Sequence, residues 1–192
     1  IVCLKQWLNK LNTKFCLIMG QINPLVGDVA GNVNKIIAAA EQAKDEFKAD
    51  LIVFPELTLT GYPPEDLLLR PGLNKRVEKG IEKLKLTIKD IAVLVGHTAG
   101  VSGEELYNAA SLIADGECLG TYYKHHLPNY GVFDERRYFV EGKEACVIDY
   151  KGLKLAITIC EDIWFSAPAA QALDAGAEII LNLNASPFRQ GK

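Results

Sequence analysis

The amino-acid sequence predicts a layered α/β domain built on a mixed sheet or on two sheets. Apolar, strand-like runs alternate with amphipathic helical segments in the first half of the chain, whereas the second half is richer in strands separated by turn residues. Strand–helix–strand units favour parallel pairing, and closely spaced strands favour hairpins. The chain has 192 residues, 49% of them hydrophobic, which is enough apolar material to bury a core.

Each element of the first half follows from a local pattern. The apolar run FCLIMGQI leads into a turn-rich link, NPLVGDVAG, after which apolar residues recur at helical spacing behind Asn32, a predicted helix cap. The apolar run LIVF stops at Pro55, and the paired prolines of GYPP exclude both a helix interior and a central strand. The expected elements are a strand over 15–22, a helix over 32–47, a strand over 51–54 and a helix over 73–89.

The second half is expected to consist mostly of strands. Gly116 and the pair Lys151–Gly152 stand where hairpin turns are needed, and Gly176 closes a short helical segment. Because the chain stops at Lys192 soon after a strand, we expect that C-terminal sequence of the domain is missing. The expected elements are strands over 91–96, 107–114, 117–123, 145–150, 153–159 and 178–182, with a helix over 166–175.

Charge and composition argue against several classes of protein. The formal net charge of −3 and the isoelectric point near 5.7 supply no basic field for nucleic acid. No run approaches the roughly 18 apolar residues of a membrane span, and the N-terminal segment lacks the pattern of a signal peptide. Five cysteines without a CxxC pair fit reduced thiols in a cytoplasmic protein better than a disulfide framework.

Three residues with complementary chemistry stand at the ends of three predicted strands. Cys160 closes the run KLAITI, Glu56 follows LIVFP, and Lys124 follows a strand that ends in two tyrosines. A thiol can act as a nucleophile, a carboxyl as an acid and base, and a lysine as a stabiliser of a thiolate or an oxyanion. Taken singly, each has an ordinary alternative: a packed cysteine, a loop glutamate and a surface lysine.

A cysteine–histidine pair that uses His125 or His126 is an alternative that these residues leave open. Adjacent strand residues point to opposite faces, so only one of the two histidines could reach a shared site. For the same reason, and because His97 stands alone, we expect no metal site.

The segments around Glu56, Lys124 and Cys160 resemble the nitrilase superfamily of carbon–nitrogen hydrolases. They read PELTLTGYPPEDLLLRPG, YYKHHLPNYGVFDERRYF and ITICEDIW, and their order matches the Glu, Lys, Cys order of that superfamily. Together with NLNASPF near the end of the chain, the sequences of these segments are most similar to the glutamine-hydrolysing domains of glutamine-dependent NAD synthetases. The resemblance covers a domain over residues 15–192, whereas residues 1–14 match nothing that we can place.

The resemblance implies an α-β-β-α sandwich, incomplete at its C-terminus, that forms homo-oligomers. It implies that the domain hydrolyses glutamine through a thioester on the cysteine, without a cofactor. The ammonia released would serve a synthetase domain that uses ATP and Mg²⁺ to make NAD from deamido-NAD and that this chain lacks. A free-standing amidase or carbamoylase and a catalytically silent assembly module are the alternatives.

The resemblance also implies roles for individual residues. Glu56 is the expected acid and base, and Lys124 and the backbone N–H of Glu161 are the expected oxyanion donors. Glu135 matches a further carboxylate that holds the lysine, with a surface charge beside two arginines as its alternative. The expected substrate contacts, for which loop packing or a turn is the alternative, are Tyr62, Tyr130, Ser186 and Lys192.

Overall fold

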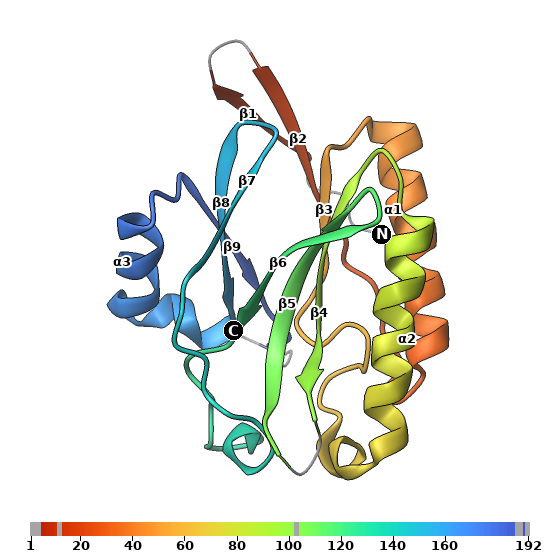
Figure 1. Ribbon diagram of the computed structural model, residues 1–192, viewed down its shortest axis with the longest axis vertical. Helices are drawn as coiled ribbons and strands as arrows, with labels where there is room; N and C mark the ends of the chain where they lie inside the picture. Colours follow the sequence, from red (N-terminus) through yellow and green to blue (C-terminus); the bar gives the residue numbers. More distant parts are fainter. Residues whose placement is uncertain (1–4, 11–12, 102–103, 187–189, 191–192) are drawn as a thin grey trace.

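The computed structural model describes residues 5–10, 13–101, 104–186 and 190 of the chain (Figure 1). Its first elements are β1 (Lys5–Lys10), β2 (Thr13–Met19), α1 (Val29–Phe47), β3 (Leu51–Val53), η1 (Glu65–Leu69), α2 (Pro71–Thr87), β4 (Ala92–Gly100) and β5 (Leu106–Ala114). They are followed by β6 (Glu117–Tyr123), η2 (Glu135–Arg137), β7 (Cys146–Tyr150), β8 (Leu153–Ile159), η3 (Cys160–Trp164), α3 (Ser166–Asp174) and β9 (Ile179–Leu183).

The described strands form two sheets, which is one of the two arrangements that the alternation of patterns left open. The larger sheet has six strands in the order β1-β2-β3-β4-β5-β6. Within it, β2, β3 and β4 are parallel and are connected through α1 and α2, while the other pairs are antiparallel. The smaller sheet joins the hairpin β7-β8 to β9, which runs parallel to β8.

The two sheets and the helices stack as an α-β-β-α sandwich (Figure 1), which confirms the expected fold class. Helices α1 and α2 cover one face of the larger sheet, the smaller sheet packs on the other face, and α3 lies outside the smaller sheet. Strand β4 shows how both faces are buried: Val93 and Val95 join the core beneath the helices, whereas Ala92 and Leu94 join the core between the sheets. A strand buried on both faces reads as a continuous apolar run, which is the pattern seen in the sequence.

The start of helix α1 and the N-terminal segment of the chain differ from the predictions. Helix α1 begins at Val29, and its cap is Asp28, whose Oδ1 accepts a hydrogen bond from the Gly31 N–H at 2.9 Å. The prediction of Asn32 as the cap was therefore wrong. The Asn32 side chain is buried and instead bonds the backbone of Leu25 and the carbonyl of Leu59. In addition, β1 lies within the segment 1–14 that had no predicted place, and it pairs with β2 as a hairpin.

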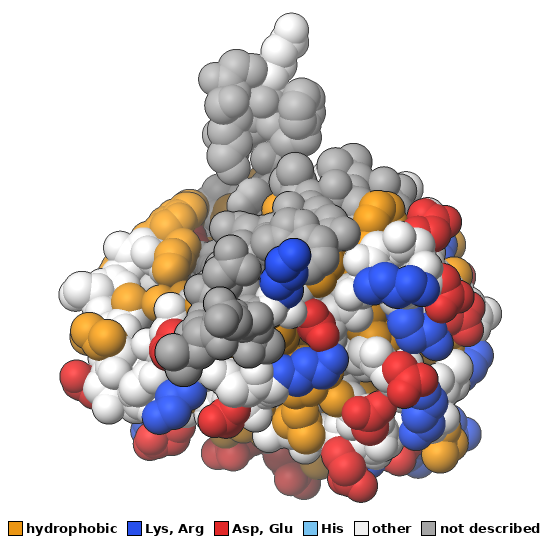
Figure 2. Space-filling view, turned by 90° about the horizontal axis from the view of Figure 1, so that it is seen from above, with side chains coloured by type: hydrophobic (Ala, Val, Ile, Leu, Met, Phe, Trp, Pro, Cys, Tyr) orange, Lys and Arg blue, Asp and Glu red, His pale blue; other side chains and the backbone are white. Residues whose placement is uncertain are grey.

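The outer surface carries charges of both signs. Figure 2 shows Lys and Arg side chains interspersed with Asp and Glu on the side where α1 and α2 lie. On this face, charges of the two signs are therefore mixed. Among the described residues, no helix combines the length and the apolar character needed to cross a bilayer.

Candidate active site

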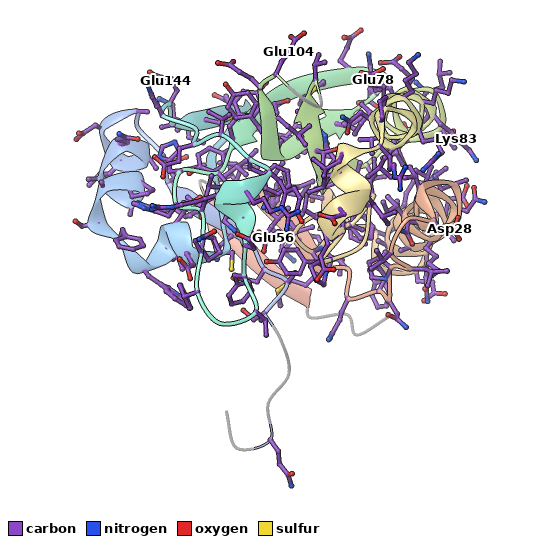
Figure 3. All side chains as sticks on the ribbon, turned by 90° about the horizontal axis from the view of Figure 1, so that it is seen from below. Asp28, Glu56, Glu78, Lys83, Glu104 and Glu144 are labelled. Atoms are coloured by element: carbon purple, nitrogen blue, oxygen red, sulfur yellow. The ribbon has the colours of Figure 1, made fainter. Side chains whose placement is uncertain are left out.

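Strand ends bring Glu56, Lys124 and Cys160 together between the two sheets. Glu56 follows β3 after a two-residue link, Lys124 directly follows β6, and Cys160 opens η3 at the end of β8. Because β3 and β6 belong to the larger sheet and β8 to the smaller one, the site lies where the two sheets face each other. Figure 3 views the molecule from below and labels Glu56, which lies in the middle of the molecule.

The loop that carries Glu56 passes very close to β4. A Cβ atom added to Gly96 would lie 2.4 Å from the Leu57 nitrogen and 2.7 Å from the Pro55 carbonyl oxygen. Side-chain atoms do not fit within such distances of a backbone, so glycine is required at this position. The close approach helps to hold Glu56 in a buried position, with 2% of its surface exposed.

Lys124 lies between two carboxylates in the interior. Its Nζ is 2.7 Å from Glu56 Oε1 and lies 2.9 and 2.8 Å from Oε1 and Oε2 of Glu135. All three side chains are almost completely buried. Burial opposes the charged ammonium, but the two carboxylates outweigh it and raise the pKa of Lys124. Lys124 is therefore a fixed cation at neutral pH.

Glu135 belongs to this cluster, and the alternative of a surface charge does not hold. It is buried, and besides Lys124 it accepts a hydrogen bond from the Tyr62 hydroxyl at 2.9 Å. Burial raises the pKa of Glu135, as does the nearby Glu56 carboxylate, while Lys124 opposes the shift. The arginines that follow it point elsewhere: Arg136 pairs with Glu141 and Arg137 with Asp66, in exposed contacts.

Cys160 occupies a sharp turn at the end of β8. Its φ angle is 51°, in the left-handed region that residues with a side chain rarely adopt. A backbone strained in this way is held by its surroundings and is often found at functional positions. Here the Ile159 N–H donates to Asp162 Oδ2 at 3.1 Å, and the Asn182 amide donates to the Cys160 carbonyl at 3.3 Å.

The Cys160 thiol is protonated in the resting site. Burial raises its pKa to about 12, and the Glu56 carboxylate adds to the shift, while Lys124 opposes it. The thiol therefore requires a base before it can attack a substrate. Glu56 is the candidate for that base: its carboxylate acts on the Cys160 thiol, and its Oε2 atom is buried without a hydrogen-bond partner among the described residues.

Two buried polar residues that support the cluster were not singled out from the sequence. Asn108, in β5, donates from Nδ2 to Glu56 Oε1 at 2.8 Å and to Glu135 Oε2 at 3.4 Å. Asp162, two residues after Cys160, accepts hydrogen bonds from the Tyr122 hydroxyl at 2.9 Å and from the His126 N–H at 2.8 Å. Asp162 thus ties the nucleophile turn to the segment that follows Lys124. The only sequence signal was a polar residue within or just after an apolar strand.

The expected substrate contacts occupy different settings. The Tyr62 hydroxyl is bonded to Glu135, and burial raises its pKa. Tyr130 is exposed, and its hydroxyl donates to the Glu161 carboxylate, a contact that raises the pKa of Tyr130 to about 12. Ser186 is exposed just beyond β9. Lys192 lies outside the described residues.

A cavity of about 260 Å³ opens beside Tyr62 and Glu135. Its walls are the loop after β3 with η1, and the segment 132–139 around η2. A second hollow of about 310 Å³ lies at the ends of β2, β3 and β9, and Pro55 lines it beside Glu56. The first cavity therefore adjoins the carboxylate cluster directly at Glu135, whereas the second reaches only Pro55, the residue before Glu56.

The cysteine–histidine alternative finds no support in the contacts of the two histidines. His125 bonds the Glu144 carbonyl at 3.2 Å and lies against the Tyr122 ring. The His126 ring stacks on Phe165 with ring centroids 3.9 Å apart. The charged groups that shift the pKa of Cys160 are instead Glu56, Lys124 and Glu135.

An α-β-β-α sandwich with a buried cluster of one cysteine, one lysine and two glutamates defines a class of protein, the hydrolases of carbon–nitrogen bonds. Residues 19–192 match the carbon–nitrogen hydrolase family, and the chain belongs to that family.

Known relatives agree with this assignment. The chain is similar to the glutamine-dependent NAD(+) synthetase of Xylella fastidiosa (strain Temecula1), with 47% identity over 92% of this chain and 32% of the relative. The corresponding protein of Thermotoga maritima is 46% identical over 91% of this chain and 30% of the relative. The chain thus spans about a third of the length of these relatives.

Solved structures show the same likeness. The structure of glutamine-dependent NAD+ synthetase from Acinetobacter baumannii in complex with ADP matches with a TM-score of 0.86 and 44% identity, covering 91% of this chain and 33% of that one. An amidase from Nesterenkonia sp. matches with a TM-score of 0.80 and 27% identity, covering 88% of this chain and 64% of that one.

Proposed function

We propose that this chain is a glutamine amidohydrolase domain that supplies ammonia for NAD synthesis. The observation that carries the proposal is the buried Cys160 thiol beside Glu56, Lys124 and Glu135. Glutamine as the substrate is supported by the likeness to glutamine-dependent NAD synthetases at 44–47% identity. The ammonia would be used by a synthetase domain that binds ATP and Mg²⁺ and converts deamido-NAD to NAD in the cytoplasm.

The reaction begins with proton transfer from Cys160 to Glu56. The sulfur then attacks the γ-carboxamide carbon of glutamine, and the carbonyl oxygen becomes an oxyanion. The Lys124 ammonium and the backbone N–H of Glu161 stabilise this charge. One such donor is worth roughly 3–4 kcal/mol in other hydrolases.

The second half of the reaction uses the same carboxyl group. Protonated Glu56 gives its proton to the leaving nitrogen, the C–N bond breaks, and ammonia leaves a thioester on Cys160. Ionised Glu56 then deprotonates a water molecule, which attacks the thioester and releases glutamate and the thiol. Division into two steps lowers the barrier of each relative to direct hydrolysis of the amide.

Lys124 can serve both the carboxylates and the oxyanion. An ammonium has three N–H donors, and Nζ contacts one oxygen of Glu56 and both oxygens of Glu135. The two Glu135 oxygens lie at nearly equal distances, so they can share a single hydrogen. One donor then remains for the substrate oxygen. Tyr62, Tyr130, Ser186 and Lys192 are the proposed contacts for the rest of the glutamine molecule.

The test separates the two activities in the complete gene product. The protein is incubated with ATP and deamido-NAD plus either glutamine or ammonium, and NAD is measured. We expect Cys160→Ala to abolish glutamine-driven synthesis and to spare ammonium-driven synthesis, while Cys118→Ala, at an exposed thiol, retains both. An unchanged glutamine-driven rate in Cys160→Ala would remove Cys160 as the nucleophile. Hydrolysis of other small amides but not of glutamine would instead indicate an amidase like that of Nesterenkonia.

A further inference from the structure

One neutral side chain spans the two carboxylates of the site. The Nδ2 atom of Asn108 lies 2.8 Å from Glu56 Oε1 and 3.4 Å from Glu135 Oε2. A carboxamide nitrogen carries two hydrogens, so it can donate one to each glutamate. Asn108 is fully buried in β5, and its backbone carbonyl accepts the N–H of Lys124 at 2.9 Å. One strand residue thus contacts all three charged members of the cluster.

The orientation of the Asn108 amide is set by the carboxylates. Its Oδ1 is buried and has no hydrogen-bond partner among the described residues. A buried oxygen without a partner is costly. Rotation of the amide by 180° would be worse, because the oxygen would then face two carboxylate oxygens. The amide is therefore held with Nδ2 toward the two carboxylates, and its Oδ1 is left without a hydrogen-bond partner among the described residues.

The cluster has too much negative charge for Lys124 alone. Two ionised carboxylates and one ammonium leave a net charge of −1 in a buried place, which favours protonation of one carboxylate. A hydrogen-bond donor favours the ionised form and, unlike a second lysine, adds no charge that would bind the substrate oxygen. The titratable groups that face Glu56 and Glu135 from the surrounding elements are Lys124 after β6, Cys160 in η3 and Tyr62 in the loop after β3.

We propose that Asn108 is a positioning residue that holds the Glu56 and Glu135 carboxylates in place around Lys124 by donating a hydrogen bond to each, so that Glu56 Oε2 is left free to accept the Cys160 proton. The inference rests on the proposed role of Glu56 as base. Asn108 touches neither the substrate nor the thiol in this scheme. It acts through the two glutamates.

The test replaces Asn108 in the complete gene product and follows the acid side of two pH profiles. The first is glutaminase activity. The second is the rate at which iodoacetamide alkylates Cys160, measured by peptide mass spectrometry, with exposed Cys118 as the reference thiol in each sample. Asn108→Leu removes the donor, and Asn108→Asp keeps the shape but replaces the donor by a carboxyl. The control is Asn74→Leu, because Asn74 in α2 is also buried and has an unpartnered amide atom, and its partner is Thr98.

We expect both Asn108 variants to move the acid limb of both profiles to higher pH by about one unit or more, the size expected for loss of a hydrogen bond to a charged group. Asn74→Leu should keep the parent profile even if its melting temperature falls. The proposal would be overturned if a folded Asn108 variant kept the acid limb of Cys160 alkylation within about 0.3 pH unit of the parent. The expected shift is several times larger. Alkylation needs no glutamine, so a protein that shows the shift but hydrolyses no glutamine would refute the proposed function and leave the role of Asn108 standing.

Discussion

Replacement of Glu135 by glutamine is a direct test of how the site uses its lysine. The variant keeps the shape of the side chain and removes its charge. In the parent, Glu135 holds the Lys124 ammonium through contacts of 2.8 and 2.9 Å and accepts a hydrogen bond from Tyr62 at 2.9 Å. The side chain introduced by Glu135→Gln can accept a hydrogen bond through its one oxygen, but its amide hydrogens would then face a second donor, either Lys124 or Tyr62. The ammonium would remain paired with Glu56 alone.

The magnitude follows from the kind of contact that is lost. A hydrogen bond between charged groups contributes about 1.5–3 kcal/mol. Because Glu56 continues to hold Lys124, we take a loss of about 2–3 kcal/mol in the transition state, which corresponds to a roughly 30- to 150-fold decrease in kcat. The KM for glutamine should change little, because Lys124 acts on charge that develops only during the reaction.

The assay is steady-state ammonia release from glutamine, with thermal unfolding as a check on folding. Glu141→Gln is the matched control, since Glu141 is exposed and its contact with Arg136 is long, at 3.7 Å. It should behave as the parent. A folded Glu135→Gln enzyme with kcat within threefold of the parent would refute the view that Glu135 holds Lys124 for catalysis.

Two further outcomes follow from the same cluster. In Lys124→Ala, binding of glutamine should survive while turnover collapses. Binding is measured by isothermal titration in the Lys124→Ala, Cys160→Ala double variant, and kcat is measured in the Lys124→Ala single variant. A variant that only raises KM would indicate a binding lysine. The second concerns stability at alkaline pH. Burial in the folded protein raises the pKa of Cys160 to about 12, from an ordinary 9.0. The contribution of the protonated thiol to stability is therefore complete below pH 9 and is lost as the pH rises toward 12. Relative to Cys160→Ala, the parent should lose about 1.4 kcal/mol of unfolding free energy per pH unit above pH 9, measured by urea unfolding; parallel curves would contradict the burial of the thiol.

The layered fold could be predicted because its strands and helices have clear local periods. The apolar run of β4 and the helical spacing in α1 each report burial of a nearby face. The predicted cap of α1 failed for a tertiary reason: the Asn32 side chain is drawn to Leu25 and Leu59, the latter 27 residues away. The local preference of asparagine for helix caps predicted the wrong role, because the Asn32 side chain instead bonds the distant Leu59 carbonyl.

Of the site, the sequence by itself determined which residue types stand at the ends of which strands: Glu56 after β3, Lys124 after β6 and Cys160 after β8. Only the tertiary structure decided that they meet, that Glu135 is buried against the lysine, and that Asn108 bridges the two glutamates. The reason is physical. The contacts of Lys124 and of Asn108 with Glu56 span 68 and 52 residues, and they depend on the pairing of strands and the packing of two sheets, which no local pattern in the chain encodes.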